Sequence, residues 1–246
     1  MRWASRRQFL YALAVFLFFA ILAGAGWFFF VYTPPTCADG IQNQNEEGVD
    51  CNGVCSKLCV APKIEALWVR AVPVAPGVYH AVASVKNPED DAEGRAIPYT
   101  FSLFDAKNIL IAERRGSLDL RPGETRPLFE ANIITGERIP ARTFVVFGDS
   151  PRWNTADRAD NPLRVISQEF DEKALRLSAL IENVTPTPVS EITISALLYD
   201  ENEILIGASE TKIDTLSPRT RREVSFTWQQ PFSAPVLRVE VVPRYR

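Results

Sequence analysis

The chain has 246 residues, a formal net charge of −3 and a single histidine, His80. This mild acidity gives no electrostatic reason to expect a nucleic-acid partner. Catalysis by imidazole has only one possible carrier, with no catalytic motif around it, and the carboxylates are scattered over turns, so we expect a protein that is not an enzyme and holds no cofactor.

The N-terminal residues predict a membrane anchor. Residues 1–7 form a basic tail, and no charged residue occurs at the 24 positions from Phe9 to Tyr32. A helix of that length extends for about 36 Å, against a hydrocarbon core of about 30 Å. We therefore expect residues 8–32 to be a transmembrane signal-anchor helix that lies in the lipid bilayer.

The basic residues predict the orientation of this helix. Arg2, Arg6 and Arg7 precede it, and no basic residue follows before Lys57. The positive-inside rule then places the N-terminus in the cytoplasm and the rest of the chain outside the inner or plasma membrane. The alternative is a signal peptide cleaved after Ala23-Gly24-Ala25; we favour the anchor because the apolar run continues well past that point.

All four cysteines lie in residues 33–61, which we expect to form a disulfide-rich module: Cys37, Cys51, Cys55 and Cys59. Disulfides persist in an extracytoplasmic compartment, and four cysteines allow three pairings, among which the sequence does not choose. Zinc held by four thiolates is the disfavoured alternative, since the spacing contains no Cys-x-x-Cys pair.

The same module offers hard oxygen ligands at nearly alternate positions, namely Asp39, Asn43, Asn45, Glu47 and Asp50. Such oxygens suit calcium, although their spacing is not that of an EF-hand. The alternative that we favour is that these side chains form Asx turns and keep the loop solvated.

The segment from Cys37 to Cys55 resembles a small module of bacterial and archaeal surface proteins. The pattern of that module is Cys-x-Asp-Gly-Ile-x-Asn, followed by Gly-Val-Asp-Cys-Gly-Gly and a further Cys. Here Asn52 replaces the first glycine of the Gly-Gly pair. The resemblance implies a surface-exposed, disulfide-bonded spacer and brings no activity with it.

The remainder of the chain repeats itself. The segment FSLFDAKNILI at 101–111 returns as ALLYDENEILI at 196–206, an offset of 95 residues. Self-similarity at a domain-sized spacing indicates a duplicated domain. We expect one domain at 62–149, a polar linker at 150–160 and a second domain at 161–246.

Within both copies, apolar residues alternate with polar ones, as in 79–85 and 192–199. This alternation is typical of antiparallel strands with one face on a core and the other in water. About seven short strands in each copy, separated by turns, predict an all-β chain with two tandem β-sandwiches.

Two single residues also carry expectations. His80 lies between Tyr79 and Ala81, which we expect to point inward, so His80 should face solvent. Asn183-Val184-Thr185 matches an N-glycosylation pattern, which is weakened by the proline that follows.

The strand ending in Phe101-Ser102-Leu103-Phe104-Asp105, with a later Pro-Gly-Glu turn, resembles small bacterial extracytoplasmic domains named for a Phe-x-Leu-Tyr-Asp motif. The second copy keeps Leu198-Tyr199-Asp200 but has Ala196 for the phenylalanine and lacks the turn glycine. The resemblance implies that both sandwiches are immunoglobulin-like and lie on the cell surface, and it brings no catalytic residues.

These features predict a membrane-anchored, extracytoplasmic protein of the cell envelope with a structural or protein-interaction role. Its expected partner is another envelope protein or a surface polymer, and its oligomeric state is left open. The alternative function is carbohydrate or polymer binding through Trp153 or Trp228. These tryptophans fall at inequivalent positions of the repeat, which is more often a sign of packing.

Overall fold

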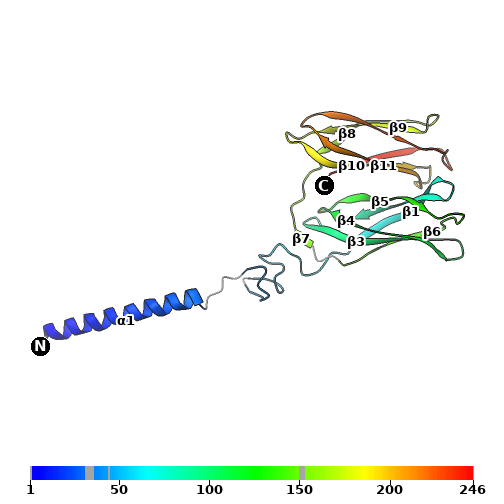
Figure 1. Cartoon of the computed structure of the whole chain (residues 1–246). Helices are drawn as coiled ribbons and strands as arrows, with labels where there is room; N and C mark the ends of the chain where they lie inside the picture. The colour runs from blue at the N-terminus through cyan, green and yellow to red at the C-terminus, as the bar shows by residue number, and fades with distance from the viewer. Residues whose placement is uncertain (1, 31–35, 44, 150–152, 246) are drawn as a thin grey trace. The chain divides into compact units, whose positions relative to one another are not determined.

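The computed structural model describes residues 2–30, 36–43, 45–149 and 153–245. The predicted end of the anchor at 31–32 and the first residues of the predicted linker, 150–152, lie outside the described residues. The chain divides into two compact units, Met1–Cys55 and Ser56–Arg246, and each is described by itself (Figure 1).

The first unit contains α1, at Arg2–Phe30, which is the one helix among the described residues. Its segment Arg6–Phe28 is long and apolar enough to cross a membrane, and none of it is buried against protein. A helix suits this role because it satisfies its own backbone hydrogen bonds, which lipid cannot do. Length and composition alone fit both an anchor and a signal sequence.

The second unit is built of antiparallel strands: β1 (Glu65–Ala75), β2 (Val78–Lys86), β3 (Ala92–Phe104), β4 (Leu110–Leu120), β5 (Thr125–Ile134), β6 (Arg142–Phe147), β7 (Trp153–Thr155), β8 (Leu163–Asp171), β9 (Arg176–Asn183), β10 (Val189–Tyr199), β11 (Leu205–Leu216), β12 (Arg221–Thr227) and β13 (Arg238–Arg244). The expectation of a mostly β chain with one N-terminal apolar helix is confirmed.

Strands β1–β7 form the first sandwich. Its sheets have the orders β1-β2-β5 and β4-β3-β6, and β7 pairs with β3. Buried side chains from both sheets, such as Ala83, Phe101 and Leu128, share one core. The sandwich has the seven strands expected of this copy; its β4 is one continuous strand, and the short β7 lies in the segment expected to be a linker.

Strands β8–β13 form the second sandwich, with sheet orders β12-β9-β8 and β11-β10-β13. Each of these strands corresponds to the strand numbered seven lower, β8 to β1 and β13 to β6 for example, so both sandwiches have the same strand order. The corners after β3 and β10 also agree. The Asp105 carboxylate accepts the N–H of Ile109, and the Asp200 carboxylate accepts that of Ile204, both at 2.9 Å.

A buried asparagine ties the two sheets together in each sandwich. Asn87 and Asn183 are fully buried and lie 96 positions apart. The Asn87 side-chain amide donates to the carbonyl oxygens of Ala92 and Arg121, at 2.6 and 2.8 Å. That of Asn183 donates to Thr187 at 2.8 Å and to Leu216 at 3.1 Å. A buried amide satisfied in this way holds loops from both sheets in register.

A third apolar core joins the two sandwiches. The outward face of β1-β2-β5 packs on the outward face of β11-β10-β13, so that the four sheets are stacked as layers (Figure 1). Val72 and Val82 meet Leu197 and Tyr199 there, and all four are at most 3% exposed. We call this contact the sandwich interface.

The sandwich interface overturns one expectation from the alternation. The outward residues of β10 were expected in water, yet Thr193, Ser195, Leu197 and Tyr199 are all buried. Alternation shows which residues share a face of a strand. It does not show that another domain covers that face.

We expect Leu197→Ala to lower the free energy of unfolding by about 2–5 kcal/mol, because it leaves a cavity in the sandwich interface. The matched control is Ser102→Ala, which alters the equivalent outward position of β3 and should change stability by less than about 0.5 kcal/mol. Chemical denaturation of both variants measures the difference. Equal effects would show that the sandwich interface contributes nothing to stability.

Candidate functional site

Two disulfides lie within residues 37–59, as the sequence predicts. Cys37 bonds to Cys55, with Cα atoms 5.6 Å apart, and Cys51 and Cys59 are also disulfide-bonded. The structure thus selects one of the three possible pairings. It also makes the zinc alternative wrong, because disulfide sulfurs are not available as thiolate ligands.

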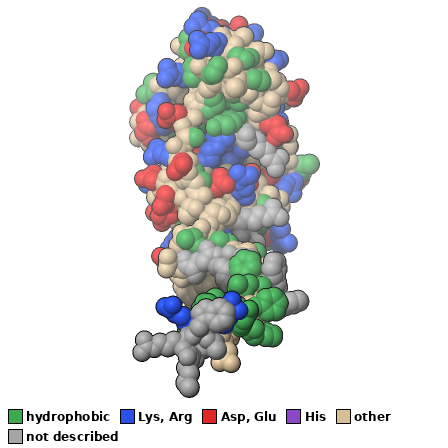
Figure 2. All heavy atoms as spheres, turned by 90° about the vertical axis from the view of Figure 1, so that its left-hand side faces the viewer, with side chains coloured by type: hydrophobic (Ala, Val, Ile, Leu, Met, Phe, Trp, Pro, Cys, Tyr) green, Lys and Arg blue, Asp and Glu red, His purple; other side chains and the backbone are tan. Residues whose placement is uncertain are grey.

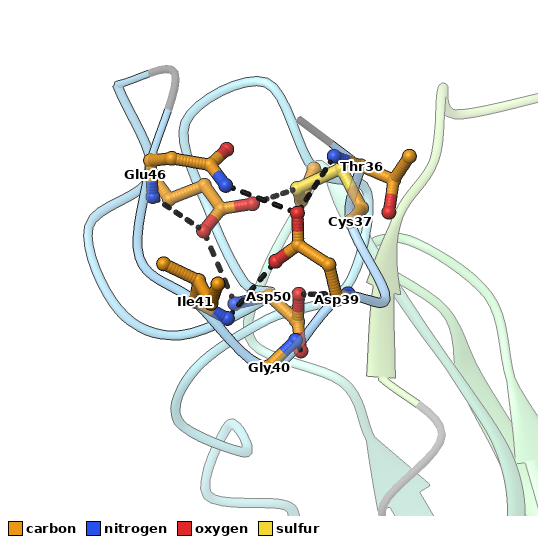
Figure 3. The surroundings of a disulfide bond; sticks show 9 residues. Thr36, Cys37, Asp39, Gly40, Ile41, Glu46 and Asp50 are labelled. Atoms are coloured by element: carbon orange, nitrogen blue, oxygen red, sulfur yellow. Dashed lines mark hydrogen bonds between the residues drawn. A yellow bond between two sulfur atoms is a disulfide. The ribbon is translucent and has the colours of Figure 1, made fainter. Parts of the chain in front are cut away.

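The carboxylates around the Cys37–Cys55 bond hold the loop by accepting backbone N–H groups (Figure 3). Asp50 accepts from Asp39 at 3.0 Å and from Gly40 at 2.9 Å. Glu46, only 7% exposed, accepts from Asn43 and Asp50 at 3.2 Å each, and its other oxygen lies 3.1 Å from the Cys55 sulfur.

Asp39 has the same role at the start of the loop. It accepts the N–H groups of Thr36 at 3.1 Å and Ile41 at 2.9 Å, and the Asn43 side-chain amide at 3.0 Å. These hydrogen bonds, the one from Thr36 first, lower the pKa of the Asp39 carboxyl below its usual value.

The five calcium candidates therefore do not form one set of ligands. Asp39, Asn43 and Asp50 lie together, whereas Glu47 accepts the side-chain amide of Asn52 at 2.8 Å. Asn45 is exposed, in a left-handed backbone conformation with φ of 80°. The hydrogen bond from the Ile41 N–H to Asp39 is that of an Asx turn, as we favoured over calcium, whereas Asp50 accepts from residues ten and eleven positions earlier and closes the loop.

His80 is half-buried, whereas we expected it to be exposed to solvent. It lies on the outward face of β2, which the sandwich interface covers, and borders a cavity of about 70 Å³ with Ile206, Trp228 and Phe232. Its Nδ1 accepts the Asn132 N–H at 3.1 Å, and its ring lies 4.8 Å from that of Phe129. Burial lowers the pKa of His80 to about 4.

The three tryptophans of the sandwiches, Trp68, Trp153 and Trp228, pack against other side chains. Trp153 is 3% exposed and belongs to the core of the first sandwich. Trp68 meets Tyr199 edge-on in the sandwich interface, at 6.3 Å between ring centres. Trp228 packs edge-on against Phe232 at 5.5 Å. The side chains suggested for sugar stacking are thus in contact with other aromatic or core residues.

Exposed apolar side chains gather on the outward face of β4-β3-β6, which we call the open face. Leu110, Phe144 and Val146 are 48%, 51% and 65% exposed. Strand register puts them on one side of the sheet with Phe104, whose ring lies 5.8 Å from that of Phe144. The Glu113–Arg115 ion pair, at 2.7 Å, lies on the same sheet and gives the apolar patch a polar border.

The second sandwich presents the equivalent face to the sandwich interface. Tyr199 and Leu205 stand where the first sandwich has Phe104 and Leu110, and they are 3% and 5% exposed. One face of the fold is therefore covered in one copy and uncovered in the other. One signal for the open face that we did not use is local, because Phe144, Val145, Val146 and Phe147 make β6 apolar on both sides.

No protein-family model matches the chain, and no curated protein matches it. Among solved structures, red sea bream transglutaminase is similar over 74% of this chain and 29% of that one, with 12% identity and a TM-score of 0.25. The chain thus spans under a third of that protein, and a similarity this weak carries no argument about function.

We expect the stability of the protein to fall as the pH is lowered from about 6.5 towards 4. In this window the unfolded chain binds a proton at His80, whereas the folded chain, with its depressed pKa, does not. His80→Gln removes this contribution and leaves all carboxylates in place. The loss of melting temperature between pH 7 and pH 4.5 should be smaller for the variant, and equal losses in both proteins would refute the assignment.

Proposed function

We propose that this chain is a single-pass protein of the cell envelope that binds another envelope protein through the open face and has no catalytic role. In this proposal α1 stays in the membrane as an anchor with its N-terminus in the cytoplasm. The disulfide module and two tandem immunoglobulin-like sandwiches then lie outside.

The comparison between the two sandwiches carries the proposal. The same sheet face is covered by a neighbouring sheet in the second sandwich and is left uncovered in the first, where Leu110, Phe144 and Val146 are exposed. Contiguous exposed apolar side chains with a polar border are typical of protein interaction sites. The outward face of β8-β9-β12, by contrast, is polar, with Arg221 paired to Glu182 at 3.0 Å.

Two further observations support the orientation and the non-catalytic role. Arg6 and Arg7 lie before the apolar segment, and no basic residue occurs between them and Lys57. His80 is neutral, its Nδ1 accepts a backbone N–H, and its ring packs on Phe129. The packed tryptophans favour protein interaction over the carbohydrate alternative.

A photo-crosslinking residue at Val146, introduced in cells, should give a discrete adduct with a partner protein. Phe144→Arg should abolish that adduct while leaving the fold intact, because Phe144 is half exposed. The matched control is the same crosslinker at Ser178, which points outward from β9 in the second sandwich and should give no adduct. Absence of an adduct at Val146, or equal adducts at both positions, would contradict the proposal.

Cysteine oxidation tests the orientation. Cells treated with a thiol-blocking reagent before lysis should yield a peptide pair linked through Cys37 and Cys55, because this bond persists only in an oxidising compartment. Unlinked, blocked cysteines would place the module in the cytoplasm and overturn the proposed topology. A link between Cys37 and Cys51 would contradict the pairing.

A further inference from the structure

A cleft lies where the two sandwiches meet at one end of their sheets. Two adjoining cavities of about 280 and 660 Å³ share Arg126, Arg244, Ala96 and Asp119 among their lining residues. Arg126 is contributed by β5 of the first sandwich and Arg244 by β13 of the second. Figure 2, which looks at the left-hand side of Figure 1, shows lysine and arginine side chains interspersed with acidic ones over that face.

Arg126 is an unusual lining residue because it is only 6% exposed. Its guanidinium donates to two carbonyl oxygens, of Asp119 at 2.8 Å and of Pro127 at 3.4 Å. Among the described residues, no carboxylate lies within 4 Å of the guanidinium of Arg126 or of Arg244. A buried charge that lacks an ionic partner is costly, and here two such charges lie close together.

Five carboxylates line the cleft, those of Glu93, Asp119, Glu124, Glu191 and Asp214, and the carboxylates nearest the arginines accept hydrogen bonds from other groups. Glu124 accepts the Arg121 N–H at 2.9 Å, Asp119 accepts the Ala96 N–H at 2.7 Å, and Glu210 accepts the Ser195 hydroxyl at 3.4 Å. Burial first, and Arg244 second, lower the pKa of Arg126 to about 10, although Glu124, Glu210 and Asp119 act in the opposite direction. Burial lowers the pKa of Arg244 as well. Glu210, Glu124 and Asp119 thus offset only part of the cost of burying these two charges, since the pKa of each arginine stays below its usual value.

A buried arginine at the position of Arg126 occurs in the first sandwich but not in the second. The residue equivalent to Arg126 is Arg222, 96 positions later, and it is exposed on the second sandwich. Arg244 is on the last strand of the second sandwich and meets the first sandwich only because the sandwich interface brings the two together. Folding of a sandwich therefore does not require the pair.

We propose that this cleft is a binding site for a small tetrahedral oxyanion, of the phosphate or sulfate class, held between the guanidinium groups of Arg126 and Arg244. Planar guanidinium groups bind such anions through paired, charge-assisted hydrogen bonds. The cavity volumes leave room for the ion and for water. The site differs from the open face and does not depend on the function proposed for it.

The test is a titration of the full chain, in detergent, with inorganic phosphate. Calorimetry measures binding, and thermal unfolding measures the change in melting temperature. Sodium chloride at matched ionic strength corrects for general screening. Wild-type protein should bind phosphate and gain melting temperature beyond the chloride reference. Arg244→Gln should weaken phosphate binding by about tenfold or more, since one of the two guanidinium groups is lost.

Two controls make the result decisive. Arg222→Gln removes an exposed arginine of equal charge from the second sandwich, so it should leave phosphate binding unchanged. The second variant is Arg126→Lys, which keeps a positive charge at this buried position so that the protein still folds. It should also weaken phosphate binding, because lysine lacks the planar guanidinium group. No binding beyond the chloride reference, or equal weakening by Arg244→Gln and Arg222→Gln, would overturn the proposal.

Discussion

The contact between the outward faces of β1-β2-β5 and β11-β10-β13 is the constraint on which the rest of this structure depends. Two small sandwiches joined by a short connection are ordinarily free to move, since interfaces between domains are commonly polar and modest in size. Here Val82 and Leu197 are as buried as residues of either core. Burial of this third apolar layer converts two small cores into one larger folded body.

The sandwich interface also separates the roles of the two copies. In the second sandwich the face that carries Tyr199 is buried against the first sandwich. Its side chains must therefore be apolar and must pack against Trp68 and Phe129. In the first sandwich the equivalent face does not pack against the other sandwich. The arginine cleft exists for a related reason, because Arg126 and Arg244 are brought together only by the packing of one sandwich on the other.

Much of the fold could be predicted from the sequence because its signals are local. The charge-free run of α1, the four clustered cysteines, the period of two in the strands and the Asp105 and Asp200 corners each depend on a few adjacent residues. The burial of β10 on both faces could not be predicted, because a period of two is the same whether the outward side meets water or protein. His80 was misjudged for this reason, and the arginine cleft escaped notice because its two guanidinium groups are 118 positions apart in the sequence, from 126 to 244.

The buried Asn183 has a consequence for covalent modification. A glycosyltransferase needs the side-chain amide nitrogen of its acceptor asparagine to be accessible. In this fold that nitrogen lies in the interior and donates to the carbonyl oxygens of Thr187 and Leu216. The Asn183-Val184-Thr185 tripeptide is therefore closed to sugar attachment once the second sandwich has folded. A glycan added earlier would occupy the space between the two sheets and keep them apart.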